Sequence, residues 1–348
     1  MDEKNDILSL TFDELQDYFA DIGEKPFRGR QVFRWLHNRC VADFDEMTDL
    51  AKDLRQRLPD LARITRLEIT EEQLAEDGTR KYRFGLHDGL EIEGVFMPEA
   101  KRATLCISTQ VGCAMGCAFC ATGTMGLVRN LSAGEIVGQV EAVVSALRDG
   151  AQDRPVSNVV FMGMGEPLAN LDAVASAVDI LLHPMGLNLG RRHLTVSTVG
   201  LLPAMERFVR EVPVRLAVSL NATTDEQRSR LMPINRKHPI AELMKTCRNL
   251  PLQQNYRITF EYVMFKGIND QDEDIERLAR LVKDVHAKVN LIPYNPCEGL
   301  PFEAPDEARV RVFADRLSDL HVTAMVRRSR GDKLKAACGQ LVTGLKSL

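Results

Sequence analysis

Hydrophobic and polar positions change their period along the chain, and three regions can be told apart. Up to about residue 60 the apolar positions recur at helical spacing, as in DELQDYFADIG and RQVFRWLHN. Thr11 with Glu14 three residues later fits a capping box, and Thr48 before an Asp- and Lys-rich turn predicts a further helix start. We therefore expect a small N-terminal helical domain over residues 1–66, with Trp35 in its core.

The second region alternates apolar and polar residues, which is typical of β-strands. RKYRFGL and LEIEGVFM flank a turn at His87-Asp88-Gly89, and Asp-Gly is a strong hairpin signal. The second arm ends at Pro98. Residues 67–102 are therefore predicted to form a β-hairpin extension.

From about residue 103 onward, apolar strands alternate with amphipathic helices in an α/β pattern. The expected strands are residues 103–109, 157–163, 193–198, 214–220, 257–265 and 287–293. Six strand–helix units in a row predict a parallel sheet with right-handed crossovers, and eight would be needed to close a complete barrel. We expect an open, partial TIM-like (β/α)6 barrel over residues 103–300. A helix, the strand HVTAMVRR and the C-terminal tail make up residues 301–348.

Unusual residues follow the ends of these predicted strands, where barrels of this kind place their chemistry. They are a three-cysteine loop after the first strand, residues 163–167 after the second, Ser197 after the third, Ser219 and Asn221 after the fourth, and Asn295 after the sixth. We expect them to converge on one face of the barrel.

Composition narrows the class of protein. Hydrophobic residues make up 45% of the 348 positions and charged residues 27%, which is ordinary for a globular chain of roughly two to three domains. No run of about 18 apolar residues predicts a membrane span, and the acidic, polar N-terminus does not resemble a secretory signal. We expect a cytoplasmic protein, in which the eight cysteines serve metal binding or catalysis rather than disulfides.

The distribution of charge along the chain is compatible with nucleic acid as a partner. The formal net charge of −4 argues against a protein that coats nucleic acid through bulk charge. Basic patches at residues 24–40 and 326–335 could still supply local contacts to an RNA backbone. The plain alternative for each patch is a solvated face.

The loop CAMGCAFC carries three thiols, Cys113, Cys117 and Cys120, at the spacing C-x3-C-x2-C. One interpretation is a zinc site completed by a distant fourth ligand from Cys106, Cys247, Cys297 or Cys338. The other is a four-iron cluster held by three cysteines, which leaves one iron open to a ligand from outside the protein. The spacing alone leaves both interpretations open.

This loop, with Phe119 before its last cysteine, resembles the signature of the radical S-adenosylmethionine (SAM) enzymes. The resemblance implies a [4Fe-4S] cluster on Cys113, Cys117 and Cys120, whose open iron chelates the amino and carboxylate groups of SAM, and it implies the same partial barrel. The SAM-contacting positions that it implies are Gly165, Glu166, Ser197, Ser219, Leu220, Asn221 and Asn295. Many relatives have His where this chain has Asn221. Asn does not titrate near neutral pH, so we do not expect proton transfer there, but Asn still donates and accepts hydrogen bonds, so a cofactor contact is expected.

Further segments, among them GEKPFRGRQVFRWL, VVFMGMGEPLAN, ITFEYVMFKGIND and RRSRGDKLKAACGQL, resemble the RlmN group of RNA methyltransferases along nearly the whole chain. That resemblance implies methylation of carbon 2 of an adenine in 23S rRNA and in certain tRNAs. A Cfr-like carbon-8 methyltransferase is the alternative, and a non-catalytic zinc- or iron-binding RNA module is a third. The longer helical N-terminus favours the RlmN group. The implied partners are RNA and a flavodoxin-like or ferredoxin-like electron donor, and we expect a monomer.

The resemblance also implies catalytic roles. Cys338 is methylated by one SAM, a radical from a second SAM removes hydrogen from that methyl group, and the resulting carbon joins the adenine as a protein–RNA thioether. Cys106 then resolves the adduct through a disulfide, and Glu93 is the acid/base carboxylate. The plain alternatives are a core thiol for Cys106, a buried helix thiol for Cys338 and a solvent-facing strand residue for Glu93. Cys40, Cys247 and Cys297 match no implied role.

Overall fold

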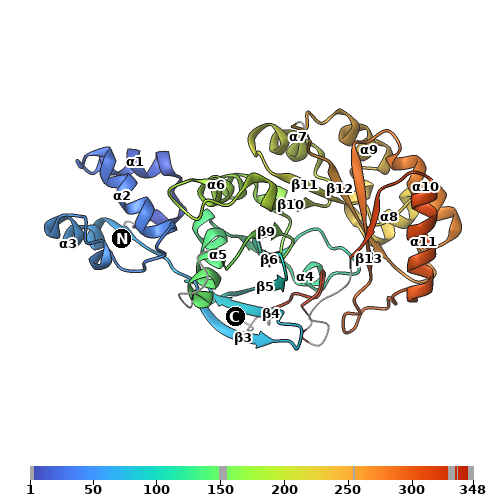
Figure 1. Cartoon of the computed structure of the whole chain (residues 1–348), viewed down its shortest axis with the longest axis horizontal. Helices are drawn as coiled ribbons and strands as arrows, with labels where there is room; N and C mark the ends of the chain where they lie inside the picture. Colours follow the sequence, from blue (N-terminus) through green and yellow to red (C-terminus); the bar gives the residue numbers. More distant parts are fainter. Residues whose placement is uncertain (1–3, 149–154, 254, 328–333, 335, 344–348) are drawn as a thin grey trace.

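The computed structural model describes residues 4–148, 155–253, 255–327, 334 and 336–343 (Figure 1). Its N-terminal lobe is built from helices, as predicted. The elements are β1 (Asn5–Asp6), η1 (Ile7–Ser9), α1 (Phe12–Asp21), α2 (Pro26–His37), η2 (Phe44–Glu46), α3 (Lys52–Leu61) and β2 (Ala62–Arg63), with β1 and β2 paired in parallel. Trp35 is buried in this lobe, with 8% of its surface exposed, which confirms its predicted place in the core.

Local capping decides where these helices begin. Thr11 and Glu14 form the predicted capping box at the start of α1. The helix start predicted at Thr48 is wrong, because α3 begins at Lys52. The main chain between η2 and α3 instead forms tight turns, in which the N–H of Thr48 donates to the carbonyl of Glu46 at 2.9 Å.

The larger lobe contains a ten-stranded sheet in the order β14-β13-β12-β11-β10-β9-β6-β5-β4-β3. Its parallel part contains all six predicted strands and the C-terminal strand. They are β6 (Arg102–Cys106), β9 (Asn158–Phe161), β10 (Leu194–Thr198), β11 (Arg215–Ser219), β12 (Ile258–Met264), β13 (Ala287–Pro293) and β14 (Ala324–Val326). Because these strands follow chain order and do not close on themselves, the predicted open (β/α)6 barrel is confirmed.

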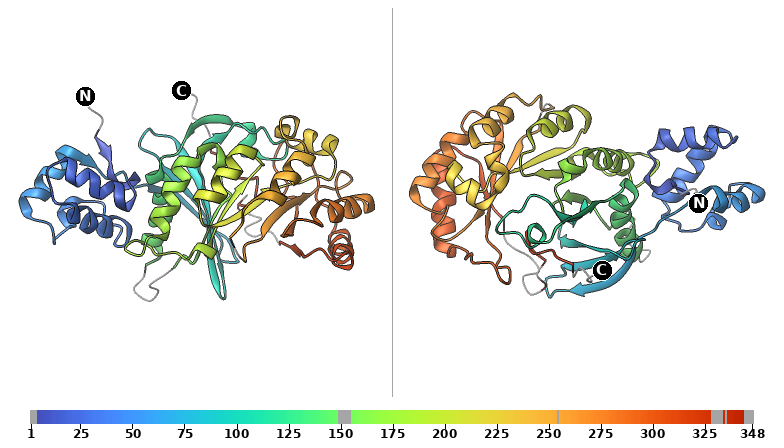
Figure 2. Two further views of the ribbon diagram at one scale, coloured as in Figure 1. Left: turned by 90° about the horizontal axis from the view of Figure 1, so that it is seen from above. Right: turned by 180° about the vertical axis from the view of Figure 1, so that it is seen from behind.

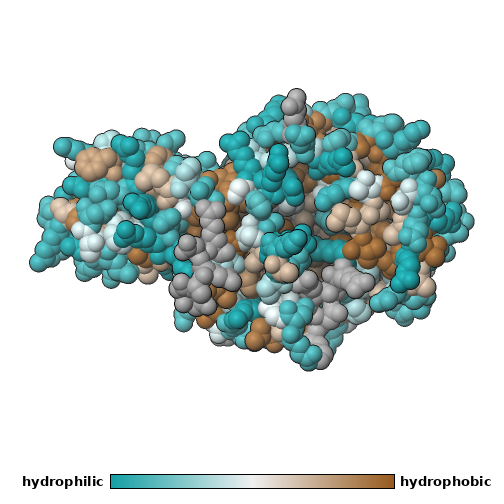
Figure 3. Space-filling model, viewed as in Figure 1, coloured by the Kyte–Doolittle hydropathy of each residue, from teal (hydrophilic) through white to brown (hydrophobic). Residues whose placement is uncertain are grey.

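Helices cover the outer face of this curved sheet (Figures 1 and 2). They are α5 (Ala133–Leu147), α6 (Leu171–Leu182), α7 (Leu202–Glu211), α8 (Asp225–Leu231), α9 (Ile240–Asn249), α10 (Asp272–Val282) and α11 (Glu307–Asp319). The core lies between strands and helices, where the β-branched and aromatic residues of the strands are buried. On the face in Figure 3, polar side chains cover most of the N-terminal lobe, and most apolar ones lie on the larger lobe.

The extension is larger than the predicted hairpin. Strands β4 (Arg80–Gly85) and β5 (Glu91–Glu99) form the expected hairpin, but β3 (Glu68–Leu74) adds a third antiparallel strand. The sequence of β3, EITEEQL, is rich in glutamate, which is depleted in strands. Cross-strand ion pairs such as Arg83–Glu71 at 2.7 Å accommodate these charges. β5 also pairs antiparallel with β6, so the extension continues the barrel sheet.

Buried polar contacts fix the N-terminal lobe on α5. The Nδ1 atom of His37 lies 2.8 Å from Glu141, and Arg66 forms an ion pair with the same carboxylate. The N–H of Gly134 donates to the hydroxyl of Ser9 at 3.0 Å. Within the described ranges, no helix is long and apolar enough to cross a membrane.

Candidate active site

A cavity of about 990 Å³, including its open mouth, lies at the carboxyl ends of the parallel strands. It unites nearly all of the residues that the sequence placed after separate strands. The predicted site residues on its lining are Cys113, Cys117, Cys120, Gly165, Glu166, Ser197, Ser219, Asn221, Asn295 and Cys338. The convergence follows from the parallel topology, since the carboxyl ends of neighbouring strands meet at the same edge.

The cysteine loop is framed by a two-stranded ribbon that the sequence did not predict. Strands β7 (Gln110–Cys113) and β8 (Gly126–Asn130) pair antiparallel on either side of the loop, which ends in the short helix α4 (Ala121–Thr124). The N–H of Ala118 donates to the carbonyl of Leu231 at 2.9 Å, so the loop is also attached to the end of α8.

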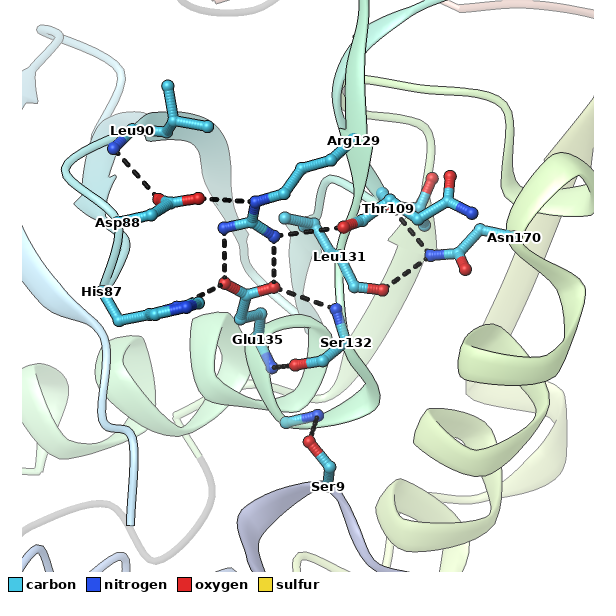
Figure 4. Close-up of polar contacts among 12 residues, drawn as sticks. Ser9, His87, Asp88, Leu90, Thr109, Arg129, Leu131, Ser132, Glu135 and Asn170 are labelled. Carbon is cyan, nitrogen blue, oxygen red and sulfur yellow. Dashed lines mark hydrogen bonds and ion pairs between the residues drawn. The ribbon is translucent and has the colours of Figure 1, made fainter. Parts of the chain in front are cut away.

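Arg129 on β8 anchors this ribbon to two other elements (Figure 4). Its two terminal nitrogens each lie 2.8 Å from the carboxylate of Glu135, and its Nε lies 2.6 Å from Asp88 in the hairpin turn. Glu135 also accepts from the N–H of Ser132 at 2.9 Å and completes the capping box of α5. A bidentate arginine–carboxylate pair with low exposure fixes orientation as well as distance. The cysteine loop therefore starts and ends on a rigid base.

The three thiols of the loop have the chemistry that an iron–sulfur cluster requires. Burial raises the pKa of Cys113 to about 11 and also raises the pKa values of Cys117 and Cys120. Thiolates in this apolar setting need a compensating positive charge, which the iron of a bound cluster would supply. Within the described ranges, no group of three or more His, Cys, Asp or Glu side chains lies in positions that could hold a metal ion. Three thiols from one loop that all line the cavity are the donor set of a four-iron cluster with one iron open to an outside ligand, so the residue types fit that group.

Gly165 and Glu166 form a tight turn at the cavity wall. Gly165 has φ +100°, and a Cβ atom there would lie 2.6 Å from the Cβ of Gln110. The carboxylate of Glu166 accepts from the N–H groups of Leu168 at 3.1 Å and Val199 at 2.9 Å. Burial raises the pKa of Glu166 to about 7. A buried carboxylate aimed at the cavity is suited to receive an ammonium group of a ligand.

Residues at the end of β11 contribute to the site in different ways. Asn221 has φ +55°, and its side-chain oxygen accepts from the N–H of Val263 at 2.8 Å. Ser219 lines the cavity, whereas the fully buried side chain of Leu220 is not part of the lining. Any contact between Leu220 and a cofactor would therefore use its main chain. The predicted SAM contacts of these residues stay predictions.

Sequence reasoning missed Arg228, which holds the ends of β10 and β11 together. Arg228 is 1% exposed, and its guanidinium donates to the carbonyls of Val199 at 2.7 Å, Ser219 at 3.1 Å and Leu220 at 3.1 Å. Burial lowers its pKa to about 10. The surrounding sequence DEQRSRL is typical of a solvated helix, so no local signal marks this arginine.

Cys106 and Cys338, which we call the second thiol pair, interact electrostatically, and neither is part of the three-cysteine loop. Burial raises the pKa of Cys106 to about 12, and the charge of Cys338 acts in the same direction. The guanidinium of Arg327 interacts electrostatically with both thiols, and its Nη1 lies 3.8 Å from the sulfur of Met162. The main-chain N–H of Met162 in turn interacts with the thiol of Cys106. All eight cysteines, each among the described residues, are free thiols.

Glu93 lies in the interior, so its interpretation as a solvent-facing strand residue is wrong. It is 1% exposed, and its Oε2 lies 2.9 Å from Nζ of Lys81. The same oxygen accepts from the N–H of Val342, four residues after Cys338, at 3.0 Å. Burial raises the pKa of Glu93, although Lys81 opposes that shift. Glu93 does not line the cavity, and its acid/base role stays a prediction.

The three cysteines without an implied role lie in different places. Cys40 follows α2 near the Arg66–Glu141 pair, and Cys247 is buried in α9. Cys297 lies beside the C-terminal tail, with its sulfur 3.5 Å from the carbonyl of Gly339.

Comparisons with known proteins identify the family to which a chain with this site is similar. Residues 5–64 match the ribosomal RNA large subunit methyltransferase N-terminal domain, and residues 107–281 match the radical SAM superfamily. The dual-specificity RNA methyltransferase RlmN of Anaeromyxobacter dehalogenans (strain 2CP-C) is 54% identical over 343 residues, which cover 98% of this chain and 92% of that protein. The protein of the same name from Geobacter sulfurreducens is 51% identical over 348 residues, covering 100% and 95%.

A solved structure supports the same assignment. The crystal structure of a radical SAM methyltransferase from Sphaerobacter thermophilus matches with a TM-score of 0.91 and 45% sequence identity, and the match covers 97% of this chain and 99% of that one. The similarity therefore includes the N-terminal lobe, the extension and the barrel. With its three-cysteine loop at the mouth of an open barrel, the chain belongs to the RlmN family of radical SAM RNA methyltransferases.

Proposed function

We propose that the chain adds a methyl group to carbon 2 of an adenosine in 23S rRNA, and also in tRNA, with Cys338 as methyl carrier and Cys106 as resolving thiol. The observation that carries this proposal is the second thiol pair. Cys338 lines the cavity, Cys106 interacts with it from the end of β6, and neither thiol belongs to the cysteine loop. The N-terminal lobe, which matches the ribosomal RNA large subunit methyltransferase N-terminal domain, favours carbon 2 over carbon 8.

Two groups complete the site in this proposal. Cys113, Cys117 and Cys120 would hold a [4Fe-4S] cluster, and SAM would contact Gly165, Glu166, Ser197, Ser219, Leu220, Asn221 and Asn295. When bound, the cluster and two SAM molecules per turnover supply a methyl group and a hydrogen-abstracting radical. Radical chemistry is needed because carbon 2 lies in an electron-poor amidine and is not nucleophilic. The adenine must also leave its stack to reach the cavity.

The protein residues then carry the methyl group through covalent steps. The sulfur of Cys338 loses its proton and gains a methyl group, which loses one hydrogen atom and bonds to carbon 2. The ring gives up the carbon-2 proton to the acid/base group and one electron, which the cluster would accept when bound, and a thioether between Cys338 and the RNA remains. The thiolate of Cys106 attacks the sulfur of Cys338, an S–S bond forms, and the released carbon takes up a proton.

The structure contains groups that suit this resolving step. Burial raises the pKa of Cys106 to about 12, so the thiol needs a nearby positive charge to ionise. Arg327 supplies that charge, since it interacts with both thiols. We propose Glu93 as the acid/base carboxylate. A flavodoxin-like or ferredoxin-like donor would supply electrons.

RNA binding is proposed for the first basic patch. Arg30 is exposed on α2, and the guanidinium of Arg28 lies 4.7 Å from the ring centroid of the exposed Phe27. Arg327 is the described arginine of the second patch; Arg328, Arg330, Lys333 and Lys335 lie outside the described residues. We also propose that the chain acts as a cytoplasmic monomer, divided into residues 1–66, 67–102, 103–300 and 301–348.

The test is turnover of a Cys106→Ala variant with RNA and SAM under reducing, anaerobic conditions. We expect an RNA adduct to accumulate on Cys338, detected by mass spectrometry, while a Cys247→Ala control releases 2-methyladenosine normally. Normal product release by Cys106→Ala without an adduct would overturn the role of Cys106. Formation of 8-methyladenosine by the unmodified protein would overturn the assignment to carbon 2.

A further inference from the structure

The C-terminal segment that carries Cys338 has no regular structure of its own. The described residues 336–343 contain neither helix nor strand. Main-chain polar groups in such a segment must find partners elsewhere when they are buried. Ala336, Ala337, Gln340 and Leu341 are buried, so the position of Cys338 depends on what the segment contacts.

The first contact is with the residues that directly follow Cys120. The N–H of Ala121 donates to the carbonyl of Gly339 at 2.7 Å. The hydroxyl of Thr122 donates to the carbonyl of Leu341 at 2.6 Å, and Thr122 is 3% exposed. Cys338 is therefore held immediately beside the cysteine loop.

The second contact is made by Gln340, which is 8% exposed. Its side-chain oxygen accepts from the N–H of Ala337 at 3.0 Å, and its side-chain nitrogen donates to the carbonyl of Pro296 at 2.8 Å. The N–H of Gln340 donates to the carbonyl of Ala337 at 3.0 Å. One side chain thus closes the turn around Cys338 and attaches it to the loop after β13.

The third contact is with the extension. The N–H of Val342 donates to Glu93, which forms an ion pair with Lys81. The cysteine loop, the loop after β13 and the extension therefore all contact the four residues that follow Cys338. Each of the three supports is remote from the segment in sequence.

We propose that Thr122 and Gln340 are positioning residues that hold Cys338 in the cavity, with Glu93 as a third support of the segment. The docking of the segment is a property of the fold. The effect on methylation rests on the proposed function of Cys338 as methyl carrier. Neither residue needs to touch SAM or RNA, since each acts on the main chain that carries the thiol.

The experiment compares Thr122→Val and Gln340→Leu with the unmodified protein, each with its cluster reconstituted. Thr122→Val removes one hydrogen bond to the segment and should raise hydrogen exchange of residues 336–343 by about two- to tenfold. Gln340→Leu removes two side-chain hydrogen bonds and should raise the exchange by at least the same factor. Methylation of Cys338, followed by mass spectrometry, should slow by a similar factor, and kcat should fall while KM for RNA stays constant. Thr122→Ser should restore both readouts. Thr124→Val removes an exposed hydroxyl that bonds only to Ala121 in its own turn, and it should match the unmodified protein.

The outcomes separate the two claims. Unchanged exchange of residues 336–343 in both Thr122→Val and Gln340→Leu would overturn the docking contacts. Faster exchange with unchanged methylation of Cys338 would overturn the positioning role. A Cys338 that gains no methyl group in the unmodified protein, while the variants still loosen the segment, would instead overturn the proposed function.

Discussion

Glu141 is the buried carboxylate that joins the N-terminal lobe to α5, and its replacement should loosen that lobe. The side chains of Glu141 and His37 are each 1% exposed, and that of Arg66 is 18% exposed. Arg66 also donates to the carbonyls of Leu36 at 2.7 Å and Val41 at 2.8 Å, so it fixes the end of α2. The carboxylate of Glu141 therefore contacts two basic side chains of the N-terminal lobe, His37 and Arg66.

The expected loss in free energy of unfolding depends on which groups each substitution at position 141 leaves without a partner. Glu141→Ala removes the partner of a largely buried guanidinium and should lower the free energy of unfolding by about 3–5 kcal/mol. Glu141→Gln keeps the volume and an acceptor oxygen but loses the charge, so the loss should be about 1–3 kcal/mol. An exposed pair on α7, Arg207 with Glu211, provides the control; Glu211→Ala should change the free energy of unfolding by less than about 1 kcal/mol.

The pH dependence of this effect has a defined sign. Burial acts to raise the pKa of Glu141, but the charges of Arg66 and His37 outweigh it, and the pKa lies below its ordinary value of 4.5. A carboxyl group with a lowered pKa stabilises the fold above its unfolded-state pKa and loses that contribution as pH falls through the folded-state value. The difference between the unmodified protein and Glu141→Gln should therefore be full at neutral pH and should shrink below about pH 4.5.

The assay uses the single tryptophan as a local probe. Trp35 lies in α2 next to this junction, so its fluorescence during urea unfolding reports the N-terminal lobe. Absorption of the reconstituted cluster reports the barrel in the same sample. A Glu141→Ala variant that unfolds with the midpoint and slope of the unmodified protein would refute the buried-charge reasoning.

Three further predictions concern the cavity and the RNA surface. Gly165→Ala should cost about 2–5 kcal/mol, from strain at φ +100° and collision with Gln110, and it should weaken SAM binding as measured by calorimetry. The affinity for SAM should fall up to tenfold per pH unit below about pH 7, because Glu166 takes up a proton there and no longer attracts an ammonium group. In binding titrations, Glu166→Gln should remove this pH dependence. Replacing both Arg28 and Arg30 with Ala should weaken RNA binding and flatten its salt dependence, with iron content unchanged.

Each of these predictions has a control variant. Gly267 has φ +71° with no atom within 4 Å of an added Cβ, so Gly267→Ala should show the cost of backbone strain without a collision, for comparison with Gly165→Ala. Equal losses at both glycines would contradict the close packing on Gln110. A SAM affinity that does not change with pH would contradict the role of Glu166. Arg207→Ala with Arg210→Ala removes two cations from α7, and an equal loss of RNA affinity there would exclude specific binding by α2.

Much of the fold could be predicted because the relevant interactions are local. The period of apolar residues determined the six barrel strands and their helices, and the Asp-Gly turn determined the hairpin. The capping box at Thr11 was confirmed because both of its bonds join residues three positions apart. β3 was missed because glutamates are poor strand formers, and Glu71 and Glu72 pair with arginines of the neighbouring strand that the local sequence does not reveal.

The sequence by itself determined the three-cysteine loop and its place after the first barrel strand, because the loop and the strand are adjacent segments that local residue patterns identify. Only the tertiary structure decided what surrounds Cys338. Thr122 and Leu341 are separated by 219 positions, and Glu93 and Val342 by 249. Glu93 alternates with apolar residues as a solvent-facing strand residue would, and Arg228 lies in a stretch typical of a solvated helix. Their burial follows from the segments that pack over them, and hydrogen bonds between segments so distant leave no periodic signal in the chain.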